Sequence, residues 1–438
     1  MAGRSEWVDR DAAVVWHGFT QMAAWRDGEP IIVDRAEGHE LIDVEGRRYL
    51  DAISSLWVNT LGHRVPELDA ALVEQLSRVA HSTMLGNGNR VVVEFAEELA
   101  KRVPVDSPRI MFASDGAAAV EQALKIAFQY WWNEGERGRT RYLALTSAYH
   151  GDTVGALSLG AGEFGTELFD PLRFPVLRTP GYEDEKWADA AIEVLRGESE
   201  SLAAIVLEPV VQGAAGMLTA RPEDVARVVE AAQAAGVLVI CDEVATGFGR
   251  TGSLFACDLC GIRPDLLCLG KGITGGYLPM SATVASERVW RAFLGEDLGP
   301  RTFYHGHSYG GNALAAAVAL RHLRLLEEWK VLDNVRARSE ELREILERRL
   351  RPSPYVRDIR LVGLMGGVEL ASPDPGARWG RRVAAAAVRR GVLMRPLGDV
   401  MVLMPPLTIT SRELQKIVQV LSEAVEEVAR ASTVHDGK

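Results

Sequence analysis

The chain has 438 residues, of which 47% are hydrophobic, and 49 Lys and Arg against 60 Asp and Glu give it a formal net charge of −11 at pH 7. The hydrophobic content excludes a disordered chain, and the acidic balance argues against a nucleic-acid-binding protein, whose binding face needs a surplus of basic residues. The longest apolar runs have the length of strands, and the first residues lack the apolar centre of a secretory signal. We therefore expect a cytoplasmic protein that binds neither membranes nor nucleic acids.

Short apolar runs alternate with amphipathic segments from about residue 105 to 310, which is the pattern of a parallel sheet with helices on its faces. One such amphipathic segment, Pro222–Ala235, is predicted to be a helix that connects two strands. The candidate strands are Arg109–Ala113, Tyr142–Thr146, Ala203–Leu207, Val237–Cys241 and Leu266–Leu269. Because such sheets bind ligands beyond the carboxyl ends of their strands, we expect the functional residues there.

A second, smaller α+β lobe is predicted from the last part of the chain. An apolar helix at 312–326 leads into it, and the pattern then predicts strands at 355–370 and 394–404 and helices at 378–390 and 411–431. Two strand-like runs near the start, 31–33 and 41–44, are expected to join this lobe. We therefore predict a large α/β domain of residues 66–325 and a small domain built from residues 1–65 and 326–438.

The four cysteines all fall between residues 241 and 268. Cys257 and Cys260 have the spacing of a zinc-binding or redox pair, although one such pair is weak evidence. Cys241 and Cys268 lie in apolar runs, where thiols usually behave as small buried hydrophobic groups. We interpret all four as unbonded thiols and expect no metal site, while the roles of Cys257 and Cys260 stay open.

A single lysine, Lys271, follows the apolar run Leu266–Leu269 and enters a glycine-rich turn. The turn is not a nucleotide-binding P-loop, because Gly272 stands where that motif has Ser or Thr. Lysine is also the residue that forms Schiff bases with carbonyl substrates and with pyridoxal phosphate. Lys271 is therefore either a surface residue at a strand end or the attachment point of a cofactor.

A carboxylate, Asp242, ends the buried run Val237–Cys241 and favours the second interpretation of Lys271. A carboxylate against the pyridine nitrogen of pyridoxal phosphate keeps that nitrogen protonated, so that the ring can accept electrons from the substrate carbon. The alternative role for Asp242 is a cap of the following turn. Together, Lys271 and Asp242 predict pyridoxal phosphate.

The cofactor also needs a phosphate site and a stacking partner. Gly116 and Ala117 begin a predicted helix that runs to about Trp132, and free amides at a helix start bind anions. Taken alone, this is an ordinary capped helix. Tyr149, which follows the candidate strand Tyr142–Thr146, is well placed to stack on a flat ring.

The chain resembles the class III, fold type I pyridoxal-phosphate aminotransferases along nearly its whole length. The matching segments follow the order of that family from Ile42 to Pro406: IDVEGRRYLDA, FASDGAAAVEQALK, AYHGDT, LEPVVQG, DEVATGFGRTG, PDLLCLGKGITGGYLP, HGHSYGGNALA and RPLGDVMVLMPP. The resemblance implies a fold type I α/β structure, an enzyme that transfers amino groups between small molecules, and a homodimer with shared active sites.

The resemblance also implies roles for individual residues near the cofactor. Lys271 would bond the cofactor and move the proton, and Asp242 would pair with the ring nitrogen. Val244 and Tyr149 would pack on the two ring faces. The phosphate would be held by Gly116, Ala117 and, from the partner subunit, Ser308. Glu208 matches a Glu-Pro motif near the cofactor, with a loop-capping carboxylate as its alternative.

Three segments resemble the branch of the family that converts 8-amino-7-oxononanoate to 7,8-diaminononanoate in biotin synthesis: 16–22, 242–252 and 395–406. By this resemblance Arg395 would clamp the substrate carboxylate, since a guanidinium matches a carboxylate with two hydrogen bonds. Its alternative is a surface arginine paired with Asp399. The other expected substrate-binding residues are Phe19, Trp57, Tyr149 and Gly306.

The amino donor is either lysine or S-adenosylmethionine. Leu56, Phe19 and Ala117 depart from the residues typical of forms that use S-adenosylmethionine, and this favours lysine. The main alternative function is that of a broad ω-amine or β-alanine:pyruvate aminotransferase on the same scaffold. A pyridoxal-phosphate mutase or epimerase, and a scaffold protein without catalysis, are further alternatives.

Overall fold

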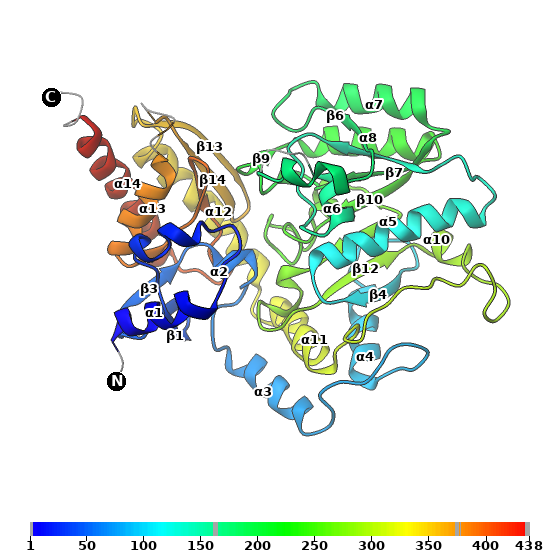
Figure 1. Ribbon diagram of the computed structural model, residues 1–438, viewed down its shortest axis with the longest axis horizontal. Helices are drawn as coiled ribbons and strands as arrows, with labels where there is room; N and C mark the ends of the chain where they lie inside the picture. The colour runs from blue at the N-terminus through cyan, green and yellow to red at the C-terminus, as the bar shows by residue number, and fades with distance from the viewer. Residues whose placement is uncertain (1–2, 161–164, 373–375, 377, 434–438) are drawn as a thin grey trace.

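A seven-stranded sheet forms the centre of the computed structural model, which describes residues 3–160, 165–372, 376 and 378–433 (Figure 1). In spatial order its strands are β4 (Arg109–Ala113), β12 (Ser281–Ala285), β11 (Leu266–Leu269), β10 (Leu238–Asp242), β7 (Leu202–Leu207), β5 (Arg141–Leu145) and β6 (Leu177–Thr179). β12 runs antiparallel to both of its neighbours, whereas β11, β10, β7, β5 and β6 pair in parallel. The predicted α/β fold class is confirmed.

Helices cover both faces of this sheet because successive strand residues point to opposite sides. On one side, Ile205 and Leu207 of β7 join the core formed with α7 (Trp187–Glu198) and α8 (Pro222–Ala234). On the other side, Ala204 and Val206 join the core formed with α5 (Gly116–Asn133). Both faces of β7 are buried, which explains its continuous apolar sequence.

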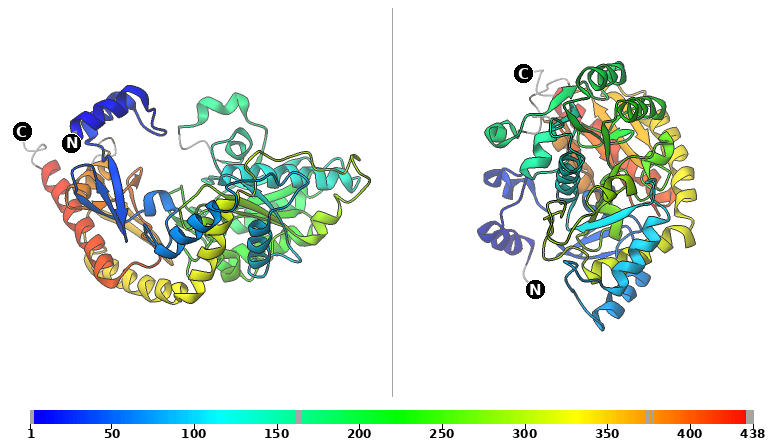
Figure 2. Two further views of the ribbon diagram at one scale, coloured as in Figure 1. Left: turned by 90° about the horizontal axis from the view of Figure 1, so that it is seen from below. Right: turned by 90° about the vertical axis from the view of Figure 1, so that its right-hand side faces the viewer.

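Two smaller sheets combine strands from both ends of the chain. One has the order β1 (Val33–Glu37), β2 (Glu40–Asp43), β3 (Arg48–Asp51) and β15 (Val392–Leu393), and the other has β13 (Val356–Val362), β14 (Met365–Leu370), β17 (Val400–Leu403) and β16 (Pro396–Leu397). In two views the blue N-terminal and orange-to-red C-terminal elements lie together, to one side of the large sheet (Figures 1 and 2). This arrangement agrees with the expected small lobe, while the boundaries 1–65, 66–325 and 326–438 stay a prediction.

The remaining elements connect or cover these sheets. The helices are α1 (Arg4–Val14), α2 (Ser54–Trp57), α3 (Pro66–Leu76), α4 (Arg90–Ala100), α6 (Val154–Leu159), α9 (Ala256–Cys260), α10 (Glu287–Arg291), α11 (Ala313–Glu328), α12 (Val331–Arg349), α13 (Trp379–Arg389) and α14 (Ser411–Thr433). The 3-10 helices are η1 (Met22–Ala24), η2 (Arg26–Gly28), η4 (Glu167–Leu172) and η5 (Lys271–Thr274), and β8 (Val211–Gln212) and β9 (Leu218–Thr219) form a small ribbon. Among the described helices, none combines the length and the hydrophobicity that a membrane-spanning helix requires.

The structure corrects the sequence prediction of the strands. In the large sheet, β6 and β12 were not predicted. In the smaller lobe, the segment 355–370 is a hairpin of β13 and β14, and the segment 394–404 contains the antiparallel pair β16 and β17. The hairpin turns at Gly363, whose φ of +57° is unfavourable for other residues and where a Cβ atom would collide with backbone of Arg250 and Thr251. Apolar residues precede and follow this turn in the sequence, so the hydrophobic pattern did not predict a break between two strands.

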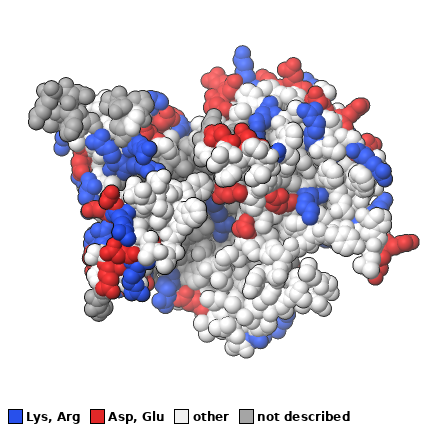
Figure 3. Space-filling model, viewed as in Figure 1, with Lys and Arg blue, Asp and Glu red and all other residues white. Residues whose placement is uncertain are grey.

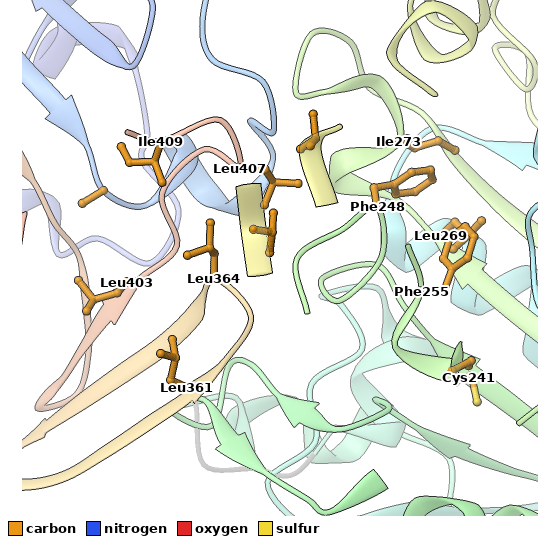
Figure 4. Close-up of a cluster of buried hydrophobic side chains, with 14 of the residues drawn as sticks. Cys241, Phe248, Phe255, Leu269, Ile273, Leu361, Leu364, Leu403, Leu407 and Ile409 are labelled. Atoms are coloured by element: carbon orange, nitrogen blue, oxygen red, sulfur yellow. The ribbon is translucent and has the colours of Figure 1, made fainter. Parts of the chain in front are cut away.

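One hydrophobic cluster joins the large sheet to the smaller lobe (Figure 4). Leu269, the last residue of β11, and Phe248, in the loop after β10, belong to the same cluster as Leu364, Leu403 and Leu407. All five side chains are at most 1% exposed. Because the core is shared, the edge of the large sheet that faces the smaller lobe is held in a fixed position.

Candidate active site

A pocket of about 490 Å³ lies at the carboxyl ends of β5, β7, β10 and β11 and beside the start of α5. Parallel strands place their carboxyl ends at one edge of the sheet, as the sequence prediction required. The pocket lining brings together eight of the predicted site residues: Lys271, Asp242, Tyr149, Gly116, Ala117, Glu208, Val244 and Trp57. Residues 150–153 also line it, although no site role was predicted for them.

The register of two strands places Lys271 near Asp242. In the parallel pair β10 and β11, Asp242 lies opposite Cys268, so the chain after β11 continues past this carboxylate. Lys271 then has a φ of +41°, a conformation that few residues other than glycine adopt. Such backbone conformations cost energy and are concentrated at functional sites.

The amine of Lys271 lies in surroundings that favour its neutral form. Burial lowers its pKa, while the negative charges of Asp242 and Glu208 act in the opposite direction. The Nζ atom lies 5.2 Å from the ring centroid of Trp57. A lysine whose pKa is lowered by burial is a stronger nucleophile at neutral pH, because more of it is unprotonated.

The carboxylate of Asp242 is 5% exposed and held by two donors. Nδ1 of His150 lies 2.7 Å from its Oδ2, and the amide of Val244 donates to its Oδ1 over 3.0 Å. Burial alone would lower the pKa of His150, but the hydrogen bond and charge of Asp242 raise it on balance. Because a carboxylate offers about four acceptor positions, Asp242 can still accept a further N–H group.

The start of α5 provides a cradle for an anion. Asp115 caps the helix by accepting a hydrogen bond from the amide of Ala118 over 2.9 Å. Within the described residues, the amides of Gly116 and Ala117 have no hydrogen-bond partner. A Cβ atom on Gly116 would lie 2.6 Å from Cγ1 of Val244, so only glycine fits here. Pyridoxal phosphate fits this set of groups: an amine, a buried carboxylate and a free helix start.

Glu208 joins two loops at the pocket. Its Oε1 accepts from the amide of Tyr149 over 3.2 Å and its Oε2 from the amide of Gly213 over 3.1 Å. Burial, together with the charge of Asp242, raises the pKa of Glu208 to about 7. Burial is also the main reason that the pKa of Tyr149 is raised, so its hydroxyl stays neutral. Glu208 therefore both lines the pocket and caps its loops.

The raised pKa of Glu208 predicts a pH effect on stability. Because the folded-state pKa of about 7 exceeds the usual glutamate pKa of 4.5, this group stabilises the fold most below about pH 4.5, and the contribution is lost as the pH rises to 7. The loss amounts to about 3 kcal/mol. We expect Glu208→Gln to flatten the decline in the free energy of unfolding between about pH 5 and pH 8. Denaturant unfolding of the full chain at both pH values measures this, and equal declines in variant and wild type would contradict it.

Four predicted site residues lie outside the pocket lining: Phe19, Gly306, Ser308 and Arg395. All four are exposed, and the Phe19 side chain is 65% exposed. Within the described residues Arg395 forms no ion pair, and Asp399 instead accepts a hydrogen bond from the amide of Gly380 over 2.8 Å. The guanidinium of Arg395 is therefore available to a ligand.

The cysteines lie apart from the lining of this pocket. All four are free, Cys257 is buried and Cys260 is partly buried. In the part of the chain that the structure describes, no three His, Cys, Asp or Glu side chains are grouped to hold a metal ion. The thiol of Cys257 has a raised pKa because it is buried, which makes it a poor nucleophile.

Comparison with known proteins identifies the family. The family model "Aminotransferase class-III" matches residues 21–425. The chain belongs to the class-III aminotransferases. This class-III aminotransferase is 47% identical over 437 residues to the adenosylmethionine-8-amino-7-oxononanoate aminotransferase of Nitratidesulfovibrio vulgaris, covering 95% of the chain and 80% of that protein. The family resemblance seen in the sequence is confirmed, and the protein is an enzyme that acts on small molecules.

Two solved structures of transaminases share the fold. The adenosylmethionine-8-amino-7-oxononanoate aminotransferase of Methanocaldococcus jannaschii superposes with a TM-score of 0.94 at 37% identity, over 97% of this chain and 99% of that one. An amine transaminase from an uncultivated Pseudomonas species, in its PLP-bound form, superposes with a TM-score of 0.86 at 32% identity, over 95% and 99%. The family depends on pyridoxal phosphate.

Proposed function

We propose that this aminotransferase transfers an amino group from S-adenosylmethionine to 8-amino-7-oxononanoate, giving 7,8-diaminononanoate, with pyridoxal phosphate as its cofactor. The observation that carries the proposal is the 47% identity, over 95% of the chain, to a relative whose name states both substrates. This identity outweighs the differences at Leu56, Phe19 and Ala117 from which the sequence favoured lysine as donor. We therefore replace lysine by S-adenosylmethionine as the expected donor.

The residues of the pocket fit the proposed cofactor. When bound, pyridoxal phosphate supplies an aldehyde that combines with amines and a ring that withdraws electrons from the substrate carbon. Lys271 would hold the cofactor through Nζ, and its amine, once released, would take up and return the proton at that carbon. Asp242 would hold the proton on the ring nitrogen. Tyr149 and Val244 would orient the ring from its two faces.

The start of α5 is the proposed phosphate site. The amides of Gly116 and Ala117 would donate to the phosphate, and the helix adds partial positive charge there. We propose that Ser308 of a second copy completes this site, since Ser308 is exposed outside the pocket of its own chain. The side chains of Tyr309, next to it in the chain, and of Leu85, which lies against Gly306, are also exposed and offer an apolar surface for a homodimer. Figure 3 also shows few Lys, Arg, Asp and Glu side chains on the lower part of the molecular face that it presents.

Substrate recognition is proposed for Arg395, Trp57, Phe19 and Gly306. Arg395→Lys should raise KM for 8-amino-7-oxononanoate by about tenfold or more, because hydrogen bonds between charged groups contribute roughly 1.5 to 3 kcal/mol. An ammonium group cannot reproduce the two parallel hydrogen bonds of a guanidinium. Steady-state kinetics with the keto acid and with a ketone that lacks the carboxylate measure this. Equal losses for both substrates would remove the proposed role of Arg395.

A single-turnover experiment tests the proposed function. The enzyme is loaded with pyridoxal phosphate, and S-adenosylmethionine, lysine or a simple ω-amine is added separately while the absorption of the cofactor is followed. We expect S-adenosylmethionine to convert the cofactor to its amine form and the keto acid to reverse this. Conversion by simple ω-amines alone, followed by efficient amination of pyruvate, would instead support the ω-amine aminotransferase function.

A further inference from the structure

The turn that places Trp57 beside Lys271 has an unusual backbone. Within α2, Ser54, Ser55 and Trp57 have φ values of +51°, +61° and +66°. At Ser55, ψ is −72°, and this pair of angles is close to that of the rare, strained γ-turn with a positive φ. Because none of these residues is glycine, the turn persists only where contacts around it hold it.

The turn presents the indole of Trp57 to the pocket. The ring centroid lies 5.2 Å from Nζ of Lys271, and the side chain is largely buried. Gly213 packs so closely that an added Cβ atom would lie 3.2 Å from Cζ3 of the indole. The position of Trp57 therefore limits the size of the groups that a substrate can place next to the amine of Lys271.

A buried carboxylate, Asp51, holds this turn. It is the last residue of β3 and is completely buried. The amide of Ser55 donates to its Oδ1 over 2.9 Å and to its Oδ2 over 2.7 Å, and the hydroxyl of Ser55 donates to Oδ2 over 3.1 Å. Asp51 therefore binds both polar groups of the residue that has the γ-turn angles.

His63 holds the other side of this carboxylate. Oδ1 of Asn59 accepts from the amide of Gly62 over 2.7 Å, so the NH2 group of Asn59 faces Nδ1 of His63, at 3.1 Å. Nδ1 then accepts, and the ring hydrogen lies on Nε2, which donates to Oδ2 of Asp51 over 3.0 Å. The hydrogen bonds described for Asp51 all come from donors, so an NH2 group in place of Oδ2 would face another donor.

We propose that Asp51 is a positioning residue that determines substrate selectivity by fixing the strained turn and, with it, the indole of Trp57. This inference rests on the proposed function of the pocket. Asp51 is not among the described residues that line the pocket, so it acts through Trp57. When its hydrogen bonds to Ser55 are weakened, the turn relaxes and the indole no longer excludes bulky groups from the space beside Lys271.

Asp51→Asn and Asp43→Asn form a matched pair of variants. Asp43 is buried to the same extent, with 1% exposed against 0%, and it holds another turn of the same sheet by accepting from the amides of Glu45 and Arg47. It is also absent from the pocket lining. Both variants should lower Tm, and neither should change the absorption of the bound cofactor.

The readout is the selectivity of the holoenzyme. It is measured as kcat/KM for 8-amino-7-oxononanoate divided by kcat/KM for an analogue with a methyl branch beside the ketone carbon. We expect Asp51→Asn to lower this ratio by about tenfold, which is the usual effect of one methyl-sized group in a fitted pocket, and Asp43→Asn to leave it unchanged.

A double variant tests whether Asp51 acts through Trp57. In a Trp57→Ala background, Asp51→Asn should have no further effect on the ratio, because the indole that Asp51 positions is gone. An unchanged ratio in Asp51→Asn would overturn the inference. An equal fall in Asp43→Asn, or a further fall in the Trp57→Ala background, would also overturn it.

A second variant keeps the test decisive if Asp51→Asn does not fold. His63→Leu removes one donor from the same carboxylate and should lower the ratio in the same direction, and an unchanged ratio would count against the inference. If the wild-type enzyme does not accept 8-amino-7-oxononanoate, the proposed function is wrong. Two ω-amines of different bulk then supply the selectivity ratio, and the same outcomes decide the role of Asp51.

Discussion

Lys271→Ala should lower kcat for amino transfer by about 10⁴-fold and remove covalent attachment of the cofactor. The variant loses both the amine that holds the cofactor and the group that moves the proton at the substrate carbon. Burial lowers the pKa of this amine, which suits it to both tasks. Borohydride reduction followed by peptide mass spectrometry measures attachment, and steady-state kinetics measure the rate.

Lys416 provides the matched control for this prediction. It is an exposed lysine on α14, and it does not line the pocket. Lys416→Ala should keep both the covalent adduct and the rate of the wild-type enzyme. A reduced adduct found on another lysine in the Lys271→Ala variant would show that the cofactor is held elsewhere.

Asp242→Asn should lower kcat by about 10²-fold to 10³-fold while the protein still binds the cofactor through Lys271. A neutral amide does not stabilise the positive charge on the ring nitrogen, and loss of one such electrostatic contact commonly costs this much. The amide also cannot accept from both His150 and Val244 with the geometry of a carboxylate. Single-turnover rates with donor, together with the absorption spectrum of the bound cofactor, measure the effect.

Asp224 provides a carboxylate of comparable burial for the control. It is 6% exposed, lies on α8 and pairs with Arg221 and Arg227 at 2.7 and 3.0 Å. Asp224→Asn should lower stability at most, with no change in the cofactor spectrum. If Asp242→Asn kept the single-turnover rate of the wild type, the proposed contact with the ring nitrogen would be wrong.

The sequence predicts the parallel strands β5, β7, β10 and β11 because they are short runs of apolar residues that are nearly all buried. The parallel strand β6 was missed because it has three residues, one of them an exposed arginine. β12 was missed because Ser281 and Thr283 interrupt its apolar pattern. Their hydroxyl groups are satisfied inside the fold, since Ser281 donates to the carbonyl of Asp115 and Thr283 to the carbonyl of Ala119. These hydrogen bonds let the polar hydroxyl groups be buried, but their acceptors belong to the start of α5 and cannot be recognised from the sequence of the strand.

The candidate site could be predicted where its residues belong to local motifs. Lys271 and Asp242 follow strands whose carboxyl ends meet, so their proximity follows from the topology. His150 lies within one of the matching segments, but its contact with Asp242 crosses a third strand and needs the three-dimensional structure. Phe19 and Arg395 lie on segments outside the pocket lining, and their roles stay predictions.

A crystal structure of the enzyme loaded with pyridoxal phosphate tests the central claim most directly. We predict continuous density from Nζ of Lys271 to the cofactor, with the ring nitrogen within hydrogen-bond distance of the Asp242 carboxylate and the phosphate at the amides of Gly116 and Ala117. A cofactor attached to another residue, or a ring nitrogen that faces away from Asp242, would contradict the account.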